Sequence, residues 1–397
     1  MFRLLKSIVF LLVFSIFGWV GWSSYMYFFD TSLPQVSVVG LNTASYCCGD
    51  VQCMLLSDKK CKVSIQLDGQ LLNSHEELCK PDQECQFTIP TRTISNGKHI
   101  LKVSAVDSTY RKNKTCYECD FYVDNTPLQA AFVKPDSDYK VLQGRTLHVQ
   151  FQVNKAIKEA KVKALAQDWE CYAESSSSLI YQCPIPITCE EQPNEYLFTV
   201  ELTDCVGNTL TLDNKFQVVF FPFKKERLNV SPEKVKEERE LGLADDLEIK
   251  LEDIAKNSLP EKLWRGTFCP PIDIERITCE YGTVRTTQEK GRYIHKALDL
   301  INAPKSVVWA PQNGVVVLKE RFPLNGNTIV IDHGYGVISM LCHLDSFANI
   351  EVGQKVVKGN PVGTIGKTGY ATGYHLHWEQ RIKNIAVDPI QWTKATF

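Results

Sequence analysis

An uncharged apolar run from Ser7 to Phe29 constrains this chain of 397 residues more than any other feature. Because about 20 apolar residues in a helix cross the hydrocarbon core of a bilayer, the run is long enough to span a membrane. Arg3 and Lys6 precede it, which predicts a cytoplasmic N-terminus and places everything after Asp30 outside the cytoplasm. A cleaved signal peptide is the alternative, but the run is long for one and no clear small-residue cleavage site follows it. We therefore predict an uncleaved membrane anchor.

Fifteen cysteines support export independently of the apolar run. In a reducing cytosol, Cys116 and Cys119 would suggest half of a zinc ribbon, whereas beyond a membrane anchor disulfides are the simpler interpretation. Spacing does not define the pairs. Cys269 and Cys279 flank one short segment with no other cysteine nearby, and they are the pair that we favour. Cys342 stands alone and is expected to be a buried thiol.

Two all-β modules are predicted between residues 33 and 223, divided at residues 126 and 127. Short segments of alternating polarity recur between turn residues, at intervals typical of β-sandwiches. The segment 96–107 is echoed by the segment 194–204, and a loop and another strand follow each copy. This pattern resembles the immunoglobulin-like modules of bacterial surface proteins. We interpret the modules as spacers, while binding to the wall or to a protein partner remain open alternatives.

The connector from Lys224 to Trp264 is charged and contains no cysteine. The segment 231–233 is a good helix start, with a capping hydroxyl, a proline at the first helical position and an acidic residue in the first turn. Apolar side chains then follow at helical spacing and form one face of a helix that ends before Pro260: Leu243, Leu247, Leu251 and Ile254. This helix either packs on the next domain and restricts access to it or belongs to a solvated linker. The sequence does not decide between the two.

Five of the eight histidines lie in the final third of the chain, where glycine-punctuated β segments return. His375, His377 and Glu379 alternate with apolar residues, so on a strand all three share one face. His295 and Asp299 are four residues apart and share a face of either a strand or a helix. Two imidazoles and a carboxylate are a common ligand set for catalytic zinc, which needs three protein ligands and an open position.

The spacings His295-x-x-x-Asp299 and His375-x-His377 resemble the two signature motifs of the lysostaphin/LytM-type zinc endopeptidases, with His343 between them. The glycine-rich segments 326–336 and 352–373 also resemble the family, and the match runs from about residue 267 to the C-terminus. This chain departs from the family pattern at five positions, none of them a predicted ligand: Ala297, Lys305, Val307, Leu341 and Trp378. Two of these departures carry an expectation. Ala297 replaces a usual glycine, which matters only if that position needs a positive φ, and Leu341 replaces a common tyrosine and is expected to alter the substrate groove.

The resemblance implies that His295, Asp299 and His377 bind Zn²⁺ and that His343 and His375 are catalytic, flanking the attacking water. Zinc lowers the pKa of its water and polarises the scissile carbonyl. One histidine then accepts the proton of the water, and the other stabilises the oxyanion; which one is the base stays open.

The remaining histidines have a simpler interpretation. His333 looks like part of a turn at residues 332–334, with a substrate contact as the less favoured alternative. His75, His99 and His148 fall in the β modules and are expected to be structural.

The sequence thus predicts a mainly β protein with an N-terminal transmembrane helix, two immunoglobulin-like β-sandwiches, a helical connector and a β-rich LytM-type peptidase domain. The predicted boundaries are residues 1–32, 33–126, 127–223, 224–264 and 265–397. Residues 7–29 would hold it in the inner (cytoplasmic) membrane as a single-pass protein, with the catalytic domain in the periplasm or cell-wall space.

The activity implied by the resemblance is zinc-dependent cleavage of peptide bonds in peptidoglycan cross-links or stem peptides. The cysteines suit a periplasm with disulfide-forming machinery, which favours a D-alanyl–diaminopimelate cross-link over an oligoglycine bridge. The formal net charge of −2 gives no reason to expect a nucleic-acid partner. The alternative is a catalytically silent LytM-type domain that activates another cell-wall hydrolase, but every residue of the motifs persists here.

Overall fold

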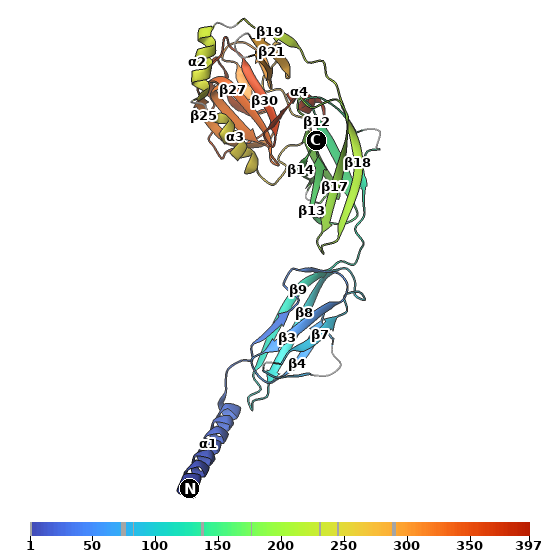
Figure 1. Ribbon diagram of the computed structural model, residues 1–397, viewed down its shortest axis with the longest axis vertical. Helices are drawn as coiled ribbons and strands as arrows, with labels where there is room; N and C mark the ends of the chain where they lie inside the picture. Colours follow the sequence, from blue (N-terminus) through green and yellow to red (C-terminus); the bar gives the residue numbers. More distant parts are fainter. Residues whose placement is uncertain are drawn as a thin grey trace. The chain divides into compact units, whose positions relative to one another are not determined.

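The computed structural model describes residues 2–72, 77–81, 83–135, 139–175, 177–229, 232–243, 246–287 and 291–397. The described chain is mainly β, as predicted (Figure 1). It divides into two compact units. The first comprises residues 1–127 with 205–207, and the second comprises residues 128–204 with 208–397.

The first unit begins with one long apolar helix, α1 (Phe2–Phe29). By length and composition, the window from Leu12 to Phe29 is able to cross a membrane. A signal sequence near an N-terminus has the same properties, so the uncleaved anchor stays a prediction.

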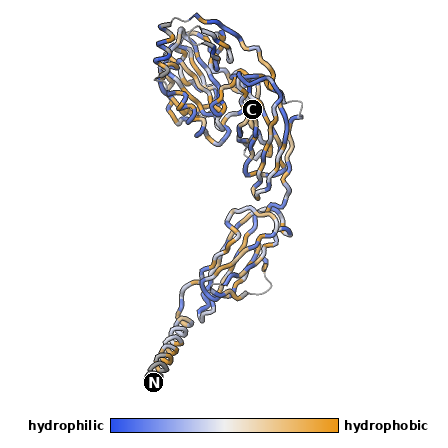
Figure 2. Tube along the Cα trace, viewed as in Figure 1, coloured by the Kyte–Doolittle hydropathy of each residue, from blue (hydrophilic) through white to orange (hydrophobic). Residues whose placement is uncertain are grey.

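Two sheets follow α1 in the first unit and share one core. The smaller sheet has the order β1-β3-β7; the larger has the order β2-β9-β8-β4-β5, and β6 also pairs with β4. Polar and apolar residues alternate along their strands, so one face of each sheet is buried (Figure 2). The strands are β1 (Val36–Val39), β2 (Tyr46–Cys47), β3 (Val51–Ser57), β4 (Cys61–Leu67), β5 (Gln70–Leu71), β6 (Glu77–Cys79), β7 (Cys85–Ile89), β8 (Gly97–Asp107) and β9 (Lys114–Val123).

The second unit begins with another pair of sheets around a core that is rich in phenylalanine. Their orders are β10-β12-β16-β15 and β11-β18-β17-β13-β14. The two copies of the weak sequence repeat form β8 and β17. Each of these strands lies inside its sheet, paired with a neighbouring strand on both sides. The strands are β10 (Ala130–Phe132), β11 (Lys140–Leu142), β12 (Thr146–Val153), β13 (Ile157–Ala164), β14 (Gln167–Glu170), β15 (Tyr172–Ala173), β16 (Ile180–Pro186), β17 (Glu195–Asp204) and β18 (Thr209–Val219).

The connector contains β19 (Lys225–Arg227) and two helices, α2 (Pro232–Leu243) and α3 (Leu247–Lys256). The prediction of one continuous helix through Leu243 and Ile254 was wrong, because Asp246 between the two helices is not helical. The predicted capping residue, Ser231, lies outside the described residues. Of the two alternatives for the connector, the structure shows packing: Leu247 and Leu251 are buried against the following sheet.

The C-terminal part is built on one large sheet that carries most of the candidate residues. The main path of this sheet is β20-β23-β30-β27-β26-β25-β28, with β24, β29 and β31 paired at its margins. A separate three-stranded sheet has the order β19-β21-β22. The elements are β20 (Arg276–Cys279), β21 (Thr283–Thr287), β22 (Gly291–His295), β23 (Leu298–Ile301), β24 (Val307–Trp309), β25 (Gly314–Phe322), β26 (Gly326–Asp332), β27 (Val337–Phe347), β28 (Lys355–Val356), β29 (Pro361–Ile365), β30 (Leu376–Ile382), β31 (Ile385–Val387) and α4 (Pro389–Lys394).

Polar contacts join the second pair of sheets to this C-terminal part. The backbone N–H of Thr146 donates to Gln391 at 2.7 Å, and the indole of Trp392 donates to the Thr146 hydroxyl at 3.0 Å. The rings of Tyr172 and Tyr335 stack with centroids 4.0 Å apart. Residues 128–397 therefore form one packed body, apart from residues 205–207.

The cysteines only partly follow the sequence prediction. Cys342 is a fully buried thiol, which confirms its prediction. The favoured pair is absent, because Cys269 and Cys279 are both free thiols. The Cys269 sulfur lies 3.4 Å from the carbonyl oxygen of Pro311, whereas Cys279 lies opposite Asp299 on neighbouring strands. Spacing along the chain could not reveal that these two side chains point to different places.

Buried polar contacts account for three of the histidines outside the motifs. The ring nitrogens of His99 lie 2.6 Å from Asp68 and 2.7 Å from the carbonyl of Ser95. His148 contacts Gln182 at 3.0 Å. His333 is fully buried and bridges the carbonyl of Asn313 and the hydroxyl of Ser339, at 2.7 and 2.8 Å. His75 lies outside the described residues.

Candidate metal centre and active site

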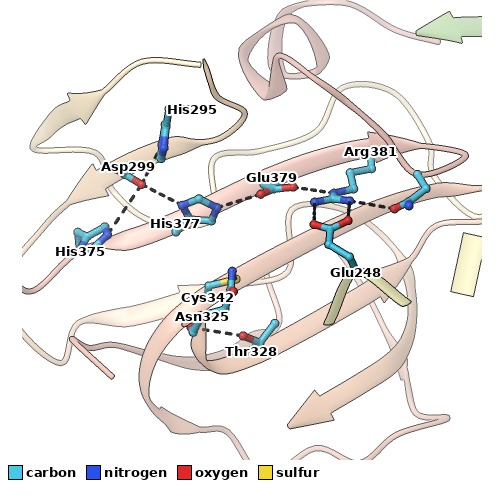
Figure 3. Close-up of polar contacts among 11 residues, drawn as sticks. Glu248, His295, Asp299, Asn325, Thr328, Cys342, His375, His377, Glu379 and Arg381 are labelled. Atoms are coloured by element: carbon cyan, nitrogen blue, oxygen red, sulfur yellow. Dashed lines mark hydrogen bonds and ion pairs between the residues drawn. The ribbon is translucent and has the colours of Figure 1, made fainter. Parts of the chain in front are cut away.

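Strand pairing brings the predicted ligands together from distant parts of the sequence. Asp299 on β23 lies directly opposite His377 on β30 in an antiparallel pair. His295 is the last residue of β22, and two residues separate it from the start of β23. The predicted strand is confirmed from Leu376 onward, so His377 and Glu379 share one face while Trp378 points into the core. His375 precedes β30 and forms an isolated bridge with Gly366. Figure 3 shows the side chains of His295, Asp299 and His377 turned toward one another.

The two predicted histidine ligands, His295 and His377, converge on one oxygen of the third, Oδ1 of Asp299. It lies 3.2 Å from Nε2 of His295 and 3.1 Å from Nδ1 of His377. Zinc bonds of 2.0–2.1 Å in tetrahedral geometry would separate neighbouring ligand atoms by about 3.3 Å, so these spacings fit a zinc ion. Nε2 of His295 is buried, and despite the short distance its contact with Asp299 lacks hydrogen-bond geometry. A buried ring nitrogen without a hydrogen bond has a lone pair available to bind a cation.

The electrostatics of these three residues favour a cation as well. Burial opposes ionisation of Asp299, but its close contacts with the rings of His295 and His377 hold its pKa well below its usual range. Burial also opposes charge on His377, yet its hydrogen bonds to Asp299 and Glu379 outweigh burial and raise its pKa to about 9. Burial lowers the pKa of His295. The centre therefore combines a persistent carboxylate with rings that supply lone pairs or accept positive charge.

His343 and His375 lie beside the ligands with similar hydrogen bonding. Nδ1 of His343 lies 2.9 Å from the carbonyl of Thr368, and Nδ1 of His375 lies 2.9 Å from that of Gly373. Their ring centroids are 4.7 Å apart, and the His343 ring is 5.8 Å from that of His377. A Nδ1–H that donates to a carbonyl leaves Nε2 of each ring as the acceptor. Burial lowers the pKa of His343 to about 3, so this ring is neutral near pH 7.

The backbone of His343 adopts a conformation that is unusual for any residue except glycine. Its φ is +61°, in the left-handed region, where a side chain costs of order 1–2 kcal/mol. The N–H of His343 donates to the carbonyl of Asn325 at 2.9 Å, which helps to hold this conformation. Strain of this kind concentrates at functional sites because the surrounding structure must maintain it.

Sequence reasoning missed several residues around the centre. The sulfur of Cys279 falls within 4.8 Å of potential ligand atoms of His295 and Asp299. A terminal nitrogen of Arg285 lies 3.8 Å from Oδ2 of Asp299. No local spacing links either residue to the motifs, because strand register alone places them. Arg381, by contrast, continues the alternation of His377 and Glu379 along β30 and was detectable from the sequence.

The backbone conformation of Ala297 and the burial of Leu341 test the expectations for these two departures from the family pattern. Ala297 is absent from the described residues with positive φ, so its Cβ causes no strain there. The prediction for Leu341 was wrong: its side chain is fully buried in the core beside Trp378 and does not line a groove. A cavity of about 770 Å³ lies elsewhere, between β13, β17, β18 and the end of α3, and no histidine lines it.

Comparison with known proteins identifies the C-terminal part. Residues 293–389 match the family model described as Peptidase family M23. The C-terminal region of this chain is therefore an M23 (LytM-type) peptidase domain, as the sequence motifs predicted.

Two curated proteins are similar to part of this chain. Over 120 residues the chain is 30% identical to the peptidoglycan DD-endopeptidase ShyC of Vibrio cholerae, covering 30% of this chain and 28% of the relative. Over 125 residues it is 35% identical to the DD-carboxypeptidase/endopeptidase Mpg of Neisseria meningitidis, covering 32% and 29%. The chain thus spans less than a third of the length of these relatives.

A solved structure of a putative M23 peptidase from Pseudomonas aeruginosa is also similar. Its identity is 22%, its TM-score is 0.46, and the alignment covers 64% of this chain and 96% of that one.

Proposed function

We propose that this chain is a zinc-dependent endopeptidase that hydrolyses peptide bonds in peptidoglycan cross-links or stem peptides. The observation that carries the proposal is the convergence of His295 and His377 on Oδ1 of Asp299, at 3.2 and 3.1 Å. The relative ShyC is named a peptidoglycan DD-endopeptidase, and the relative Mpg is named a DD-carboxypeptidase/endopeptidase; these names support the choice of substrate.

Zinc would be held by Nε2 of His295, Oδ1 of Asp299 and Nδ1 of His377. When bound by such a set, zinc makes a water molecule more acidic and polarises a substrate carbonyl. The ionised carboxylate of Asp299 supplies the only formal negative charge among these three ligands, and β23 and β30 fix it opposite His377. Cys279 is the neighbouring group that would compete as a fourth ligand.

His343 and His375 would handle protons and the oxyanion. Each ring is oriented by a Nδ1–H bond to a backbone carbonyl, so its Nε2 faces the site. A neutral ring accepts the proton of the attacking water, and a ring that carries a proton stabilises the oxyanion and then protonates the leaving amine. The low pKa of His343 keeps its ring neutral in the free protein, and which of the two rings acts as the base stays open.

The other parts of the chain would place this site at its substrate. We propose that α1 anchors the chain in the cytoplasmic membrane through residues 7–29, with all that follows in the periplasm or cell-wall space. We also propose that residues 33–126 and 127–223 are immunoglobulin-like modules that act as spacers, followed by a connector over 224–264 and the peptidase domain over 265–397. Two sheets around one core in each region support that division.

The test is digestion of purified cross-linked peptidoglycan by the full-length chain in detergent, with soluble products identified by mass spectrometry. We expect chelator-sensitive release of peptides by the wild-type chain and a loss of at least about 100-fold in His343→Ala. The exposed Asp168, paired with Lys161 far from the site, provides the control Asp168→Asn. Zinc binding without release of peptides would contradict the proposal and favour a silent domain that activates another hydrolase.

A further inference from the structure

A chain of charged contacts links the connector helix α3 to His377 (Figure 3). Nε2 of His377 lies 3.0 Å from Oε1 of Glu379, and Nε of Arg381 donates to Oε2 of the same carboxylate at 2.6 Å. The two terminal nitrogens of Arg381 donate to the two carboxylate oxygens of Glu248, at 2.7 and 2.8 Å. Glu248 belongs to the first turn of α3 and is the end of this series of contacts.

The two central residues of this series, Glu379 and Arg381, are buried and held in a fixed orientation. The side chains of Glu379 and Arg381 are 9% and 8% exposed. A buried ion pair keeps its geometry only where hydrogen bonds satisfy both partners. Here the guanidinium donates to Glu379, to both oxygens of Glu248 and, at 2.9 Å, to Asn384. The Glu248 side chain is 71% exposed, and its two-pronged contact adds a pair of charge-assisted hydrogen bonds of defined geometry to the Arg381 guanidinium, on the far side from Glu379.

The Glu379 carboxylate in turn bears on metal binding. A histidine that binds a metal usually donates its other ring N–H to a carboxylate or carbonyl, which fixes its tautomer and ring plane. With the Nε2–H of His377 directed to Glu379, Nδ1 is left for the cation beside Asp299. Glu379 and Arg381 lie inside the region that matches the M23 model, whereas Glu248 precedes it.

We propose that α3 positions His377 for metal binding through Arg381 and Glu379, which makes Glu248 a positioning residue supplied by the connector. This inference rests on the proposed function in taking His377 as a zinc ligand. It assigns the connector a second role besides burying Leu247 and Leu251: docking of α3 raises the affinity of the centre for its metal.

The experiment measures zinc affinity of the full-length chain by chelator competition. Glu379→Gln removes the direct partner of His377 and should weaken zinc binding by about 10–100-fold, as for other outer-sphere partners. Glu248→Gln keeps the size but loses the charge and one acceptor, and should weaken binding by a smaller factor, roughly 3–10-fold. Lys250→Gln is the matched control, because Lys250 also lies on α3 and joins it to the sheet, through Glu320 at 2.8 Å, without touching the chain of contacts. It should change the affinity by less than about twofold.

A second readout needs no metal. In the metal-free protein, NMR should show slow exchange of the His377 Nε2 proton with water in the wild type and Lys250→Gln, and faster exchange in Glu248→Gln. Unchanged zinc affinity and proton exchange in Glu248→Gln would overturn the inference. Equal losses in Glu248→Gln and Lys250→Gln would also overturn it, because they would show that any weakening of helix docking has the same effect.

Failure of the proposed function would look different. The wild type and its variants could show the expected order of zinc affinities while the wild type leaves peptidoglycan intact. That result would refute the endopeptidase and support the inference. For a wild-type chain that binds no zinc, exchange of the His377 proton alone would decide: faster exchange in Glu248→Gln supports the positioning role, and equal exchange refutes it.

Discussion

Oδ1 of Asp299 lies 3.1 Å from Nδ1 of His377, its direct partner across the antiparallel pair of β23 and β30. The two residues are far apart in sequence, yet strand register makes them neighbours. Because backbone hydrogen bonds fix both strands, the pair is held in place before any metal arrives. A site built on strands keeps its ligands in position better than one built on loops.

Asp299 should be indispensable for metal binding. Asp299→Asn keeps the shape of the side chain but removes the negative charge on which His295 and His377 converge. We expect zinc affinity to fall by more than about 100-fold, beyond the loss typical of outer-sphere partners. Competition with a chelator measures this, with Asp168→Asn as the control. Retention of affinity within tenfold would argue that another group, such as Cys279, completes the centre.

The left-handed backbone of His343 allows a test of strain. At an ordinary position glycine is less stable than alanine, but at a φ of +61° the order should reverse. We expect His343→Gly to be more stable than His343→Ala by about 1 kcal/mol, since both lose the same ring and only alanine keeps a Cβ. Denaturant unfolding of the two variants measures the difference. Equal stability, or a more stable alanine variant, would show that this conformation is not maintained in solution.

Buried His333 should make the fold sensitive to mild acid. Burial lowers its pKa to about 4, below the value of about 6.5 for an exposed histidine. The folded protein therefore binds fewer protons than the unfolded chain between these values. The stability linked to His333 is complete above pH 6.5 and is lost as pH falls from 6.5 toward 4, by about 3 kcal/mol in all.

The measurement is the free energy of unfolding at pH 7.5 and pH 4.5 for the wild type and His333→Gln. The variant should start less stable, because it loses one of the two buried contacts, but it should lose less stability on acidification. A pH dependence identical to that of the wild type would mean that His333 does not titrate with unfolding.

Docking of α3 should depend on its buried leucines. Leu251 is completely buried against the sheet, and truncation to alanine leaves a cavity that costs about 2–5 kcal/mol. We expect Leu251→Ala to increase hydrogen exchange of the α3 amides. Ile249, on the same helix and 72% exposed, provides the control Ile249→Ala, which should change exchange little. Similar exchange in both variants would indicate that α3 is not held by this apolar contact.

Short-range patterns predicted what is local in this structure. The alternation around His377 gave a strand with His377 and Glu379 on one face, and the four-residue spacing of His295 and Asp299 put both at one site. Side chains alternate between the two faces of any strand, so this pattern can be interpreted without knowing the fold. The family resemblance rested on the same segments.

What the sequence did not reveal depends on register between distant strands and on packing. Cys279 was paired with Cys269 on spacing alone, although β20 and β23 turn it toward Asp299. Leu341 was placed in a groove, but β27 directs it into the core. Glu248 carried no signal, because its partner Arg381 lies on a strand more than a hundred residues later. Contacts of this kind follow from the fold rather than from any window of sequence.

X-ray absorption at the zinc edge of the zinc-loaded, full-length chain tests the central claim most directly. If His295, Asp299 and His377 hold the metal, the spectrum should contain nitrogen and oxygen ligands at about 2.0–2.1 Å and no sulfur. The same sample of His377→Ala should bind little or no zinc. A sulfur ligand at about 2.3 Å would contradict the account, because it would place Cys279 on the metal and close the position that the substrate water needs.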